Sequence, residues 1–286
     1  MKSTPYLSVI IPCHENANSL SWILKSIVSA KFTDLEVICV DDQSVKDDIK
    51  TVANTFGFRY YRLPDDRPGR RAMARNCGHK NAKGEVTLYL DGDIIPEPRL
   101  LGYCAQLHQR EKEVAIKYPV YSITIPVQKM GLTRLIESII SHNIEFFGPL
   151  VTKHVGIDTR PLPKRLRGIR TKLWVLCASH CTSFLRKDIE FANGWDENFK
   201  GWGEEDLELA YRLYKRGIDF LYPHRKYGAA YHLDHTVNWQ INYKSLMENV
   251  RRFRDKHPES WEGRRGILKM FLGENQLPEY PNGGKK

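Results

Sequence analysis

The stretch "EVTLYLDGD", residues 85–93, has the pattern of a short buried strand that ends in two carboxylates. Side chains at positions i and i+2 of an extended chain point to the same side, so Asp91 and Asp93 are expected to converge. A divalent cation offsets their repulsion, and Mg²⁺ and Mn²⁺ prefer oxygen ligands. A solvated Asp-Gly turn is the competing interpretation, and it is the simpler one for this pair taken alone.

Three more strand patterns precede this segment, and a helical pattern stands between each strand and the next. The strands are expected at 7–12, 35–44, 58–63 and 85–93, and the helices at 18–30, 47–56 and 70–84. This alternation is typical of a mostly parallel sheet covered by helices on both faces. Ligands of such sheets bind at the carboxyl ends of the strands, where "PCHEN", "VDDQS" and "LDGD" stand.

The pattern weakens between residues 128 and 172, where a helix is expected at 132–147 and the rest is irregular and basic. Long irregular segments inside compact domains are often functional loops. A strand is then expected at 181–189, a helix at 201–217, one further helix after Asn242 and a flexible tail at 278–286.

Length and composition limit the class of protein. The 286 residues suffice for one large or two small domains, and the apolar runs are too short for a membrane span. Polar residues interrupt the first apolar run, which favours a strand over a signal peptide and the cytoplasm as the compartment. The six scattered cysteines are expected to be free, and Cys177, His180 and Cys181 lack the second ligand pair of a zinc site.

The formal net charge of +10 predicts a surface that attracts polyanions. No nucleic-acid-binding motif accompanies the basic clusters, which counts against nucleic acid as a partner. A peripheral contact with the anionic inner face of a membrane stays open.

More polar groups are expected at the same edge of the sheet. Asp41 and Asp42 end the second strand, where a carboxylate can accept a hydrogen bond from a base or a ribose hydroxyl. Arg71 and Arg75 lie four residues apart on one helical face, and guanidinium groups suit phosphate oxygens. A metal, an acid and an arginine together describe a nucleoside-diphosphate site. Neither a GxGxxG motif nor a P-loop occurs.

Four segments in this order and spacing resemble the GT-A glycosyltransferases of family 2: 7–27, 37–44, 74–93 and 193–213. The stretch "GWGEEDLEL", residues 201–209, is also similar to the GWGxED signature of β-1,4-galactosyltransferases, polypeptide N-acetylgalactosaminyltransferases and chondroitin-type polymerases. The resemblance implies a single GT-A domain of the α/β class. Its nucleotide-sugar half would be 1–125, its acceptor-binding and catalytic half 126–240, and its C-terminal helix and flexible tail 241–286.

The resemblance also implies roles for individual residues. Those that would contact the nucleotide sugar are Pro12, His14, Glu15, Asp41, Asp42, Arg71, Arg75, Asp91, Gly92 and Trp202. Asp93 would bind Mn²⁺ or Mg²⁺, with Asp91 beside it and with either His232 or His235, of which His232 matches more closely. Asp206 would be the general base, with Glu205 as its neighbour in the "ED" pair.

The implied activity is metal-dependent, inverting transfer of a hexose or N-acetylhexosamine from a UDP-sugar. The acceptor is undetermined: a glycan, a lipid-linked sugar, a peptide or a small molecule. A nucleotidyltransferase of similar fold is one rival, although "PCHENANS" lacks the glycine-rich loop expected after its first strand. A non-catalytic nucleotide-sugar-binding module is the other, and the acids at 204–206 could then merely complement a helix dipole.

Overall fold

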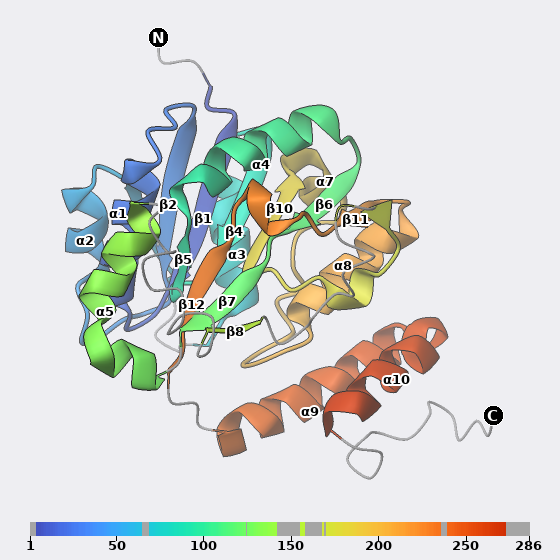
Figure 1. The fold of residues 1–286 in the computed structure, drawn as a ribbon. Helices are drawn as coiled ribbons and strands as arrows, with labels where there is room; N and C mark the ends of the chain where they lie inside the picture. Colours follow the sequence, from blue (N-terminus) through green and yellow to red (C-terminus); the bar gives the residue numbers. More distant parts are fainter. Residues whose placement is uncertain are drawn as a thin grey trace.

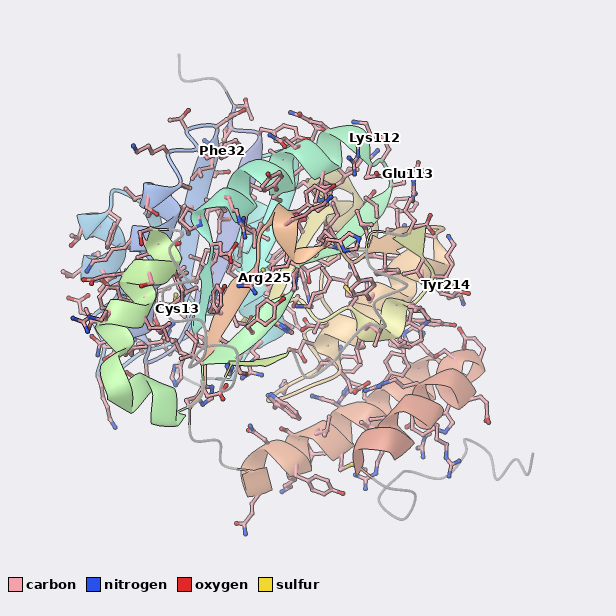
Figure 2. The ribbon with its side chains drawn as sticks, viewed as in Figure 1. Cys13, Phe32, Lys112, Glu113, Tyr214 and Arg225 are labelled. Atoms are coloured by element: carbon pink, nitrogen blue, oxygen red, sulfur yellow. The ribbon has the colours of Figure 1, made fainter. Side chains whose placement is uncertain are left out.

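The computed structural model describes residues 4–64, 69–123, 125–141, 155–157, 168, 170–235 and 239–272. A central sheet is flanked by helices on both faces, and two C-terminal helices lie side by side at one end of the molecule (Figure 1). Side chains fill the space between the sheet and its helices (Figure 2). Among the described residues, no helix has both the length and the apolar character needed to cross a membrane.

The main sheet has eight strands in the order β3-β2-β1-β4-β10-β6-β11-β9. These are β1 Leu7–Cys13, β2 Leu35–Asp41, β3 Arg59–Arg62, β4 Val86–Leu90, β6 Val114–Lys117, β9 Arg170–Thr171, β10 Cys181–Leu185 and β11 Asp219–Leu221. The first four of these in sheet order are mutually parallel, and β10 runs antiparallel to both β4 and β6. The carboxyl ends of β1, β2 and β4 therefore meet at one edge.

Both faces of this sheet are buried, which explains the continuous apolar runs of its strands. In β1, Val9 and Ile11 belong to one hydrophobic core, whereas Ile10 between them belongs to the other. The covering helices are α1 Ala17–Ser29, α2 Ile49–Thr55, α3 Arg71–Asn81, α4 Pro98–Arg110, α5 Ile125–Ile140, α7 Arg186–Phe191 and α8 Glu205–Lys215.

A second sheet of four strands has the order β5-β12-β7-β8. Its strands are β5 Ile94–Pro96, β7 Val120–Ile123, β8 Val155–Ile157 and β12 Ala230–Leu233. β12 pairs with β5 in antiparallel register, His232 opposite Ile94. This pairing carries a segment from late in the chain to the end of β4.

The predicted strand at 85–93 is divided in two. β4 ends at Leu90 and β5 begins at Ile94, so Asp91–Asp93 is a turn between two sheets rather than extended chain. The predicted strand at 181–189 likewise ends at Leu185, where α7 begins.

Two predicted helices also differ from the observed ones. The helix predicted at 201–217 begins at Glu205, because the residues before it form a turn with positive φ at Gly201, Gly203 and Glu204. The helix predicted at 132–147 is α5, which kinks at Gly131.

After Asn242 the sequence predicts one helix, whereas the structure has two. These are α9 Trp239–Lys256 and α10 Trp261–Leu272, joined by the 3₁₀ helix η5 Pro258–Ser260. The other 3₁₀ helices are η3 Trp174–Leu176 and η4 Arg225–Tyr227. The tail predicted at 278–286 and most of the loop predicted within 128–172 lie outside the described residues.

Candidate active site

The turn Asp91–Asp93 is held against the start of α1. The carbonyl of Gly92 accepts hydrogen bonds from Asn16 Nδ2 and Ser19 Oγ, each at 2.6 Å. A Cβ atom on Gly92 would lie 2.0 Å from Asn16 Nδ2 and 2.9 Å from the carbonyl oxygen of Pro12. Only glycine therefore lets the two acids approach the end of β1 so closely.

The second acid of the turn, Asp93, lies beside two histidines. Its Oδ2 is 3.3 Å from Nε2 of His232 and 3.3 Å from Nε2 of His235. The Leu233 N–H also donates to the Asp93 carbonyl at 2.9 Å, which extends the β5–β12 pairing to this residue. One ligand atom from each of the three residues lies within 4.8 Å of the others, so the group could hold a metal ion.

The charges of this group are strongly coupled. Burial alone would raise the pKa of Asp93, but hydrogen bonds from His232 and His235 outweigh it and hold that pKa well below its usual range. Burial would lower the pKa of His232, yet Asp93 and Asp234 raise it to about 9. Asp234 Oδ1 lies 2.9 Å from His232 Nδ1, an arrangement that orients Nε2 of the ring toward Asp93.

The first acid of the turn, Asp91, faces a different group. Arg75 in α3 is 1% exposed, and its Nη2 lies 2.9 Å from Asp91 Oδ1. Its Nη1 lies 3.1 Å from Glu205 Oε1 and 3.4 Å from Asp206 Oδ1. One guanidinium thus bridges the strand-end turn and the first residues of α8. The structure places Asp91 with this arginine rather than with the histidines, and Arg75 among acids.

Asp206 accepts hydrogen bonds from several other donors. Its Oδ2 accepts from the Ser179 N–H at 2.9 Å, and its Oδ1 accepts from Trp195 Nε1 at 3.2 Å and from the Ser179 hydroxyl. These contacts fix the orientation of the carboxylate at the N-terminus of α8. Ser179 and Trp195 were not singled out from the sequence, because nothing local marks them as partners of a residue that follows 27 and 11 positions later.

The two acids that start α8 differ in pKa. Burial and the nearby Asp206 raise the pKa of Glu205, against the attraction of Arg75. Burial would also raise the pKa of Asp206, but Arg75 and the two bonds from Ser179 lower it. Arg71, at the exposed start of α3, lies near enough to lower the pKa of Glu205 as well. Asp206 is therefore the stronger acid of the pair.

The two acids at the end of β2, Asp41 and Asp42, form hydrogen bonds and ion pairs with other residues of the protein. Asp41 accepts from Tyr60 Oη at 2.9 Å, from Arg62 Nη1 at 2.7 Å and from the Ser44 N–H at 2.9 Å. Asp41 is 1% exposed, so it braces the edge of the sheet.

Asp42 anchors the segment that starts α3. Its carboxylate accepts from the N–H groups of Gly69 and Arg70 at 2.8 and 2.7 Å, and it pairs with the Arg70 side chain at 2.9 Å. His14 is exposed, with Nδ1 2.8 Å from the Asp42 carbonyl oxygen. This places His14 at the same strand edge as Pro12.

Glu15 organises the loop that follows β2. The backbone φ of Glu15 is 46°. Its carboxylate accepts hydrogen bonds from three consecutive N–H groups, those of Val45, Lys46 and Asp47, at 2.7 to 3.1 Å. These bonds lower the pKa of Glu15, and the bond from the Val45 N–H has the largest effect.

Trp202 packs against the apolar cluster that includes Leu246 of α9 and Trp261 of α10.

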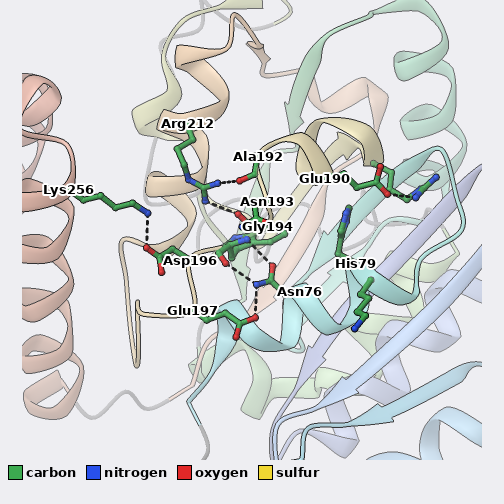
Figure 3. Close-up of a pocket in the computed structure, with 13 residues that line it drawn as sticks. Asn76, His79, Glu190, Ala192, Asn193, Gly194, Asp196, Glu197, Arg212 and Lys256 are labelled. Carbon is green, nitrogen blue, oxygen red and sulfur yellow. Dashed lines mark hydrogen bonds and ion pairs between the residues drawn. The ribbon is translucent and has the colours of Figure 1, made fainter.

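A surface hollow lies elsewhere, beside residues 192–197 (Figure 3). Its polar side chains bond to neighbouring groups: Lys256 pairs with Asp196 at 2.7 Å, and Asn76 Nδ2 donates to the Trp195 carbonyl at 2.9 Å. Neither the Asp93 group nor the acids on Arg75 line it. We therefore interpret the residues around this hollow as structural support for Trp195, and we do not assign the hollow as the active site.

A family model described as "Glycosyl transferase family 2" matches residues 8–190, more than half of the chain. The chain belongs to glycosyl transferase family 2. A second model, "N-terminal domain of galactosyltransferase", matches residues 173–236, which include α8 and His232. The resemblance in the sequence is thus confirmed in both parts.

Two curated relatives illustrate the range of this similarity. Validoxylamine A glucosyltransferase of Streptomyces hygroscopicus subsp. jinggangensis (strain 5008) is 26% identical over 269 residues, which cover 89% of this chain and 61% of that protein. Chondroitin synthase of Escherichia coli is 29% identical over 235 residues, which cover 75% of this chain and 33% of that protein. The chain thus spans about three fifths and one third of their lengths.

Solved structures share the fold. S. aureus TarS in complex with UDP-GlcNAc matches with a TM-score of 0.63 at 15% identity, over 93% of this chain and 71% of that one. The mannosyltransferase PcManGT from Pyrobaculum calidifontis, in complex with GDP-Man and Mn²⁺, matches with a TM-score of 0.58 at 16% identity, over 95% and 71%. The predicted GT-A fold is confirmed.

We expect Mn²⁺ to bind the Asp93–His232–His235 group with release of a proton. A metal takes the neutral imidazole, and the pKa of His232 is raised to about 9 in the metal-free protein. The apparent Kd should therefore fall up to about tenfold per unit of rising pH below that value. Calorimetric titration between about pH 6.5 and 8.5, in buffers of different ionisation enthalpy, measures both effects.

Asp93→Asn and Asp91→Asn form the matched pair for this experiment. The first should lose Mn²⁺ binding, whereas the second should keep it, because Asp91 faces Arg75. Equal Mn²⁺ affinity in wild type and Asp93→Asn would place the ion elsewhere.

Proposed function

We propose that this chain is a metal-dependent, inverting glycosyltransferase that moves one hexose or N-acetylhexosamine from a UDP-sugar to an acceptor. One observation carries the proposal: the turn Asp91–Asp93 connects the candidate metal-binding group with the acids that start α8. Asp91 reaches the acids of α8 through Arg75, and two residues later Asp93 reaches the histidines at the end of β12. A donor bound at Asp93 would present its sugar toward Asp206.

The donor set at Asp93 suits a metal that accepts nitrogen as well as oxygen. Imidazole and carboxylate together favour Mn²⁺ over Mg²⁺, which takes oxygen ligands almost alone. Mn²⁺ held by Asp93, His232 and His235 would stabilise the negative charge that develops on the diphosphate of departing UDP. The UDP-GlcNAc in TarS and the Mn²⁺ in PcManGT support both assignments.

Asp206 is proposed as the general base. The acceptor oxygen attacks the anomeric carbon, and the bond between that carbon and the phosphate oxygen breaks on the opposite side. The electron pair leaves with UDP, the configuration inverts, and the acceptor proton passes to Asp206. Ser179 and Trp195 hold the carboxylate in place for this transfer.

Glu205 is the alternative base. It stands next to Asp206 and its pKa is raised, which would make it the stronger proton acceptor when ionised. Its side chain is 6% exposed, against 16% for Asp206, so an acceptor reaches Asp206 more readily.

The division of the chain into halves belongs to this proposal. Residues 1–125 would hold the donor, 126–240 would bind the acceptor and supply the base, and 241–286 would form the C-terminal unit. The acceptor itself is not identified. In the basic segment at 164–172, the two described cations Arg170 and Lys172 both pair with Asp219, at 3.0 and 2.6 Å. The cytoplasmic location and a peripheral membrane contact stay predictions.

A panel of UDP-sugars tests the proposal. Each is incubated with the protein and Mn²⁺, with and without EDTA, and the nucleotide and phosphate products are separated. We expect slow hydrolysis of at least one donor to UDP, abolished by EDTA and restored by Mn²⁺. Release of pyrophosphate from a nucleoside triphosphate and a sugar phosphate would favour the nucleotidyltransferase, and UDP binding without any turnover would favour the binding module.

Asp206→Asn tests the base. With the donor found above and a working acceptor, transfer should fall by about 10²- to 10⁴-fold, because the amide cannot take the proton. Mn²⁺-dependent UDP affinity should stay near wild type. The amide nitrogen must also face a donor, either the Ser179 N–H or Trp195 Nε1, so we expect a lower unfolding temperature, measured in parallel.

Glu205→Gln is the matched control for that variant. Its amide oxygen can still accept from Arg75, so the variant should lose much less of the transfer rate than Asp206→Asn does. A larger loss in Glu205→Gln than in Asp206→Asn would move the base to Glu205.

A further inference from the structure

The turn before α8 has an unusual backbone. Gly201, Gly203 and Glu204 have φ values of 73°, 94° and 70°. Glycine adopts this left-handed region freely, whereas a residue with a Cβ does so at a cost. Glu204 immediately precedes the pair Glu205 and Asp206, so its backbone sets the direction in which both acids leave the turn.

The side chain of Glu204 is buried against a distant helix. It is 2% exposed, and its carboxylate accepts from Arg264 Nε at 2.9 Å and from Arg264 Nη2. Arg264 lies in α10 and is 6% exposed. A two-bond pair of this kind fixes both partners, and removal of either one leaves a buried charge without its counter-ion.

The preceding helix, α9, holds the backbone of the same turn. Asn249 Nδ2 donates to the carbonyls of Lys200 and Gly203 at 2.9 and 2.8 Å. Ser245 Oγ accepts from the Trp202 N–H at 3.1 Å. The two C-terminal helices thus contact the turn through its main chain and through its one buried acid.

We propose that Arg264 is a positioning residue for sugar transfer: through Glu204 it holds the turn that aims Asp206 at the acceptor. This inference rests on the proposed function, because transfer is its main readout. It assigns to α10 a role in catalysis even though the helix lies outside the stretches matched by the two family models, which end at residues 190 and 236.

The pair offers a test by double substitution. Arg264→Met leaves Glu204 buried, charged and in a left-handed backbone, so the turn should shift. A misplacement of about 1 Å at a reacting group lowers turnover by about 10²-fold. Glu204→Gly combined with Arg264→Met removes the buried charge, its partner and the backbone strain together. The double variant should therefore regain at least about tenfold in kcat over the single one.

Lys215→Met is the matched control. Lys215 pairs with Glu259 at 2.9 Å across the same junction of α8 with the C-terminal unit, but both side chains are about half exposed and neither touches the turn. Its kcat should stay within about twofold of wild type, as expected for an exposed pair. Arg264→Lys, which keeps the charge but not the fork, should be intermediate and guards against a single variant that does not fold.

Two measurements separate positioning from general stability. In the folded variants, kcat should fall while the KM for the UDP-sugar and the Mn²⁺ affinity stay within about twofold, since Asp93 and His232 lie on other elements. Hydrogen exchange at the amides of residues 203–208 should accelerate in Arg264→Met and recover in the double variant.

The inference would be overturned by a wild-type kcat and wild-type exchange protection in Arg264→Met, or by a double variant no better than the single one. Failure of the proposed function looks different: the wild type itself would transfer no sugar, while the exchange pattern of the variants would still report on the turn.

Discussion

The rest of the site depends on the ion pairs that Arg75 forms with three acids. Its guanidinium is buried in α3 and contacts Asp91 after β4 and Glu205 and Asp206 in α8. Burial would lower the pKa of Arg75, but the three acids, Asp206 first among them, raise it above its usual value. A buried arginine is costly when alone, and so are three close carboxylates, so each requires the other. The contact from Arg75 to Glu205 spans 130 residues.

Two groups of polar residues lie on opposite sides of the turn Asp91–Asp93. Asp93 faces His232 and His235, and Asp91 is joined through Arg75 to the acids of α8, so the proposed donor and acceptor chemistry would share one rigid connection. Gly92 makes that connection close-packed, because no larger residue fits against Asn16 and Pro12. On the other side, the C-terminal helices hold the turn before α8. The turn after β4 and the turn before α8 are thereby held by elements far from each other in the chain.

The sequence carried most of the fold and only part of the site. Strands buried on both faces are continuous apolar runs, so β1 to β4 and their helices could be predicted locally. The predicted convergence of Asp91 and Asp93 is wrong, because the i, i+2 rule needs extended chain, whereas β4 ends at Leu90 and the two acids face different partners. The contact of Glu204 with Arg264 joins residues that lie 60 positions apart, so no local sequence pattern predicts it. The sequence also predicts only one of the two C-terminal helices.

One buried cation holds the acid after β4 and the acids of α8 together, and Arg75→Met tests this through the pH dependence of stability. Removing the cation should cost about 3–5 kcal/mol near pH 8, where the acids are ionised. Arg75 lowers the pKa of Glu205 and of Asp206, so without it both folded-state pKa values rise above their unfolded values, and the variant gains stability relative to wild type as the pH falls through them. Denaturant unfolding at several pH values should show the deficit shrinking toward about pH 5. A deficit that is small at pH 8, or constant over this range, would contradict the claim.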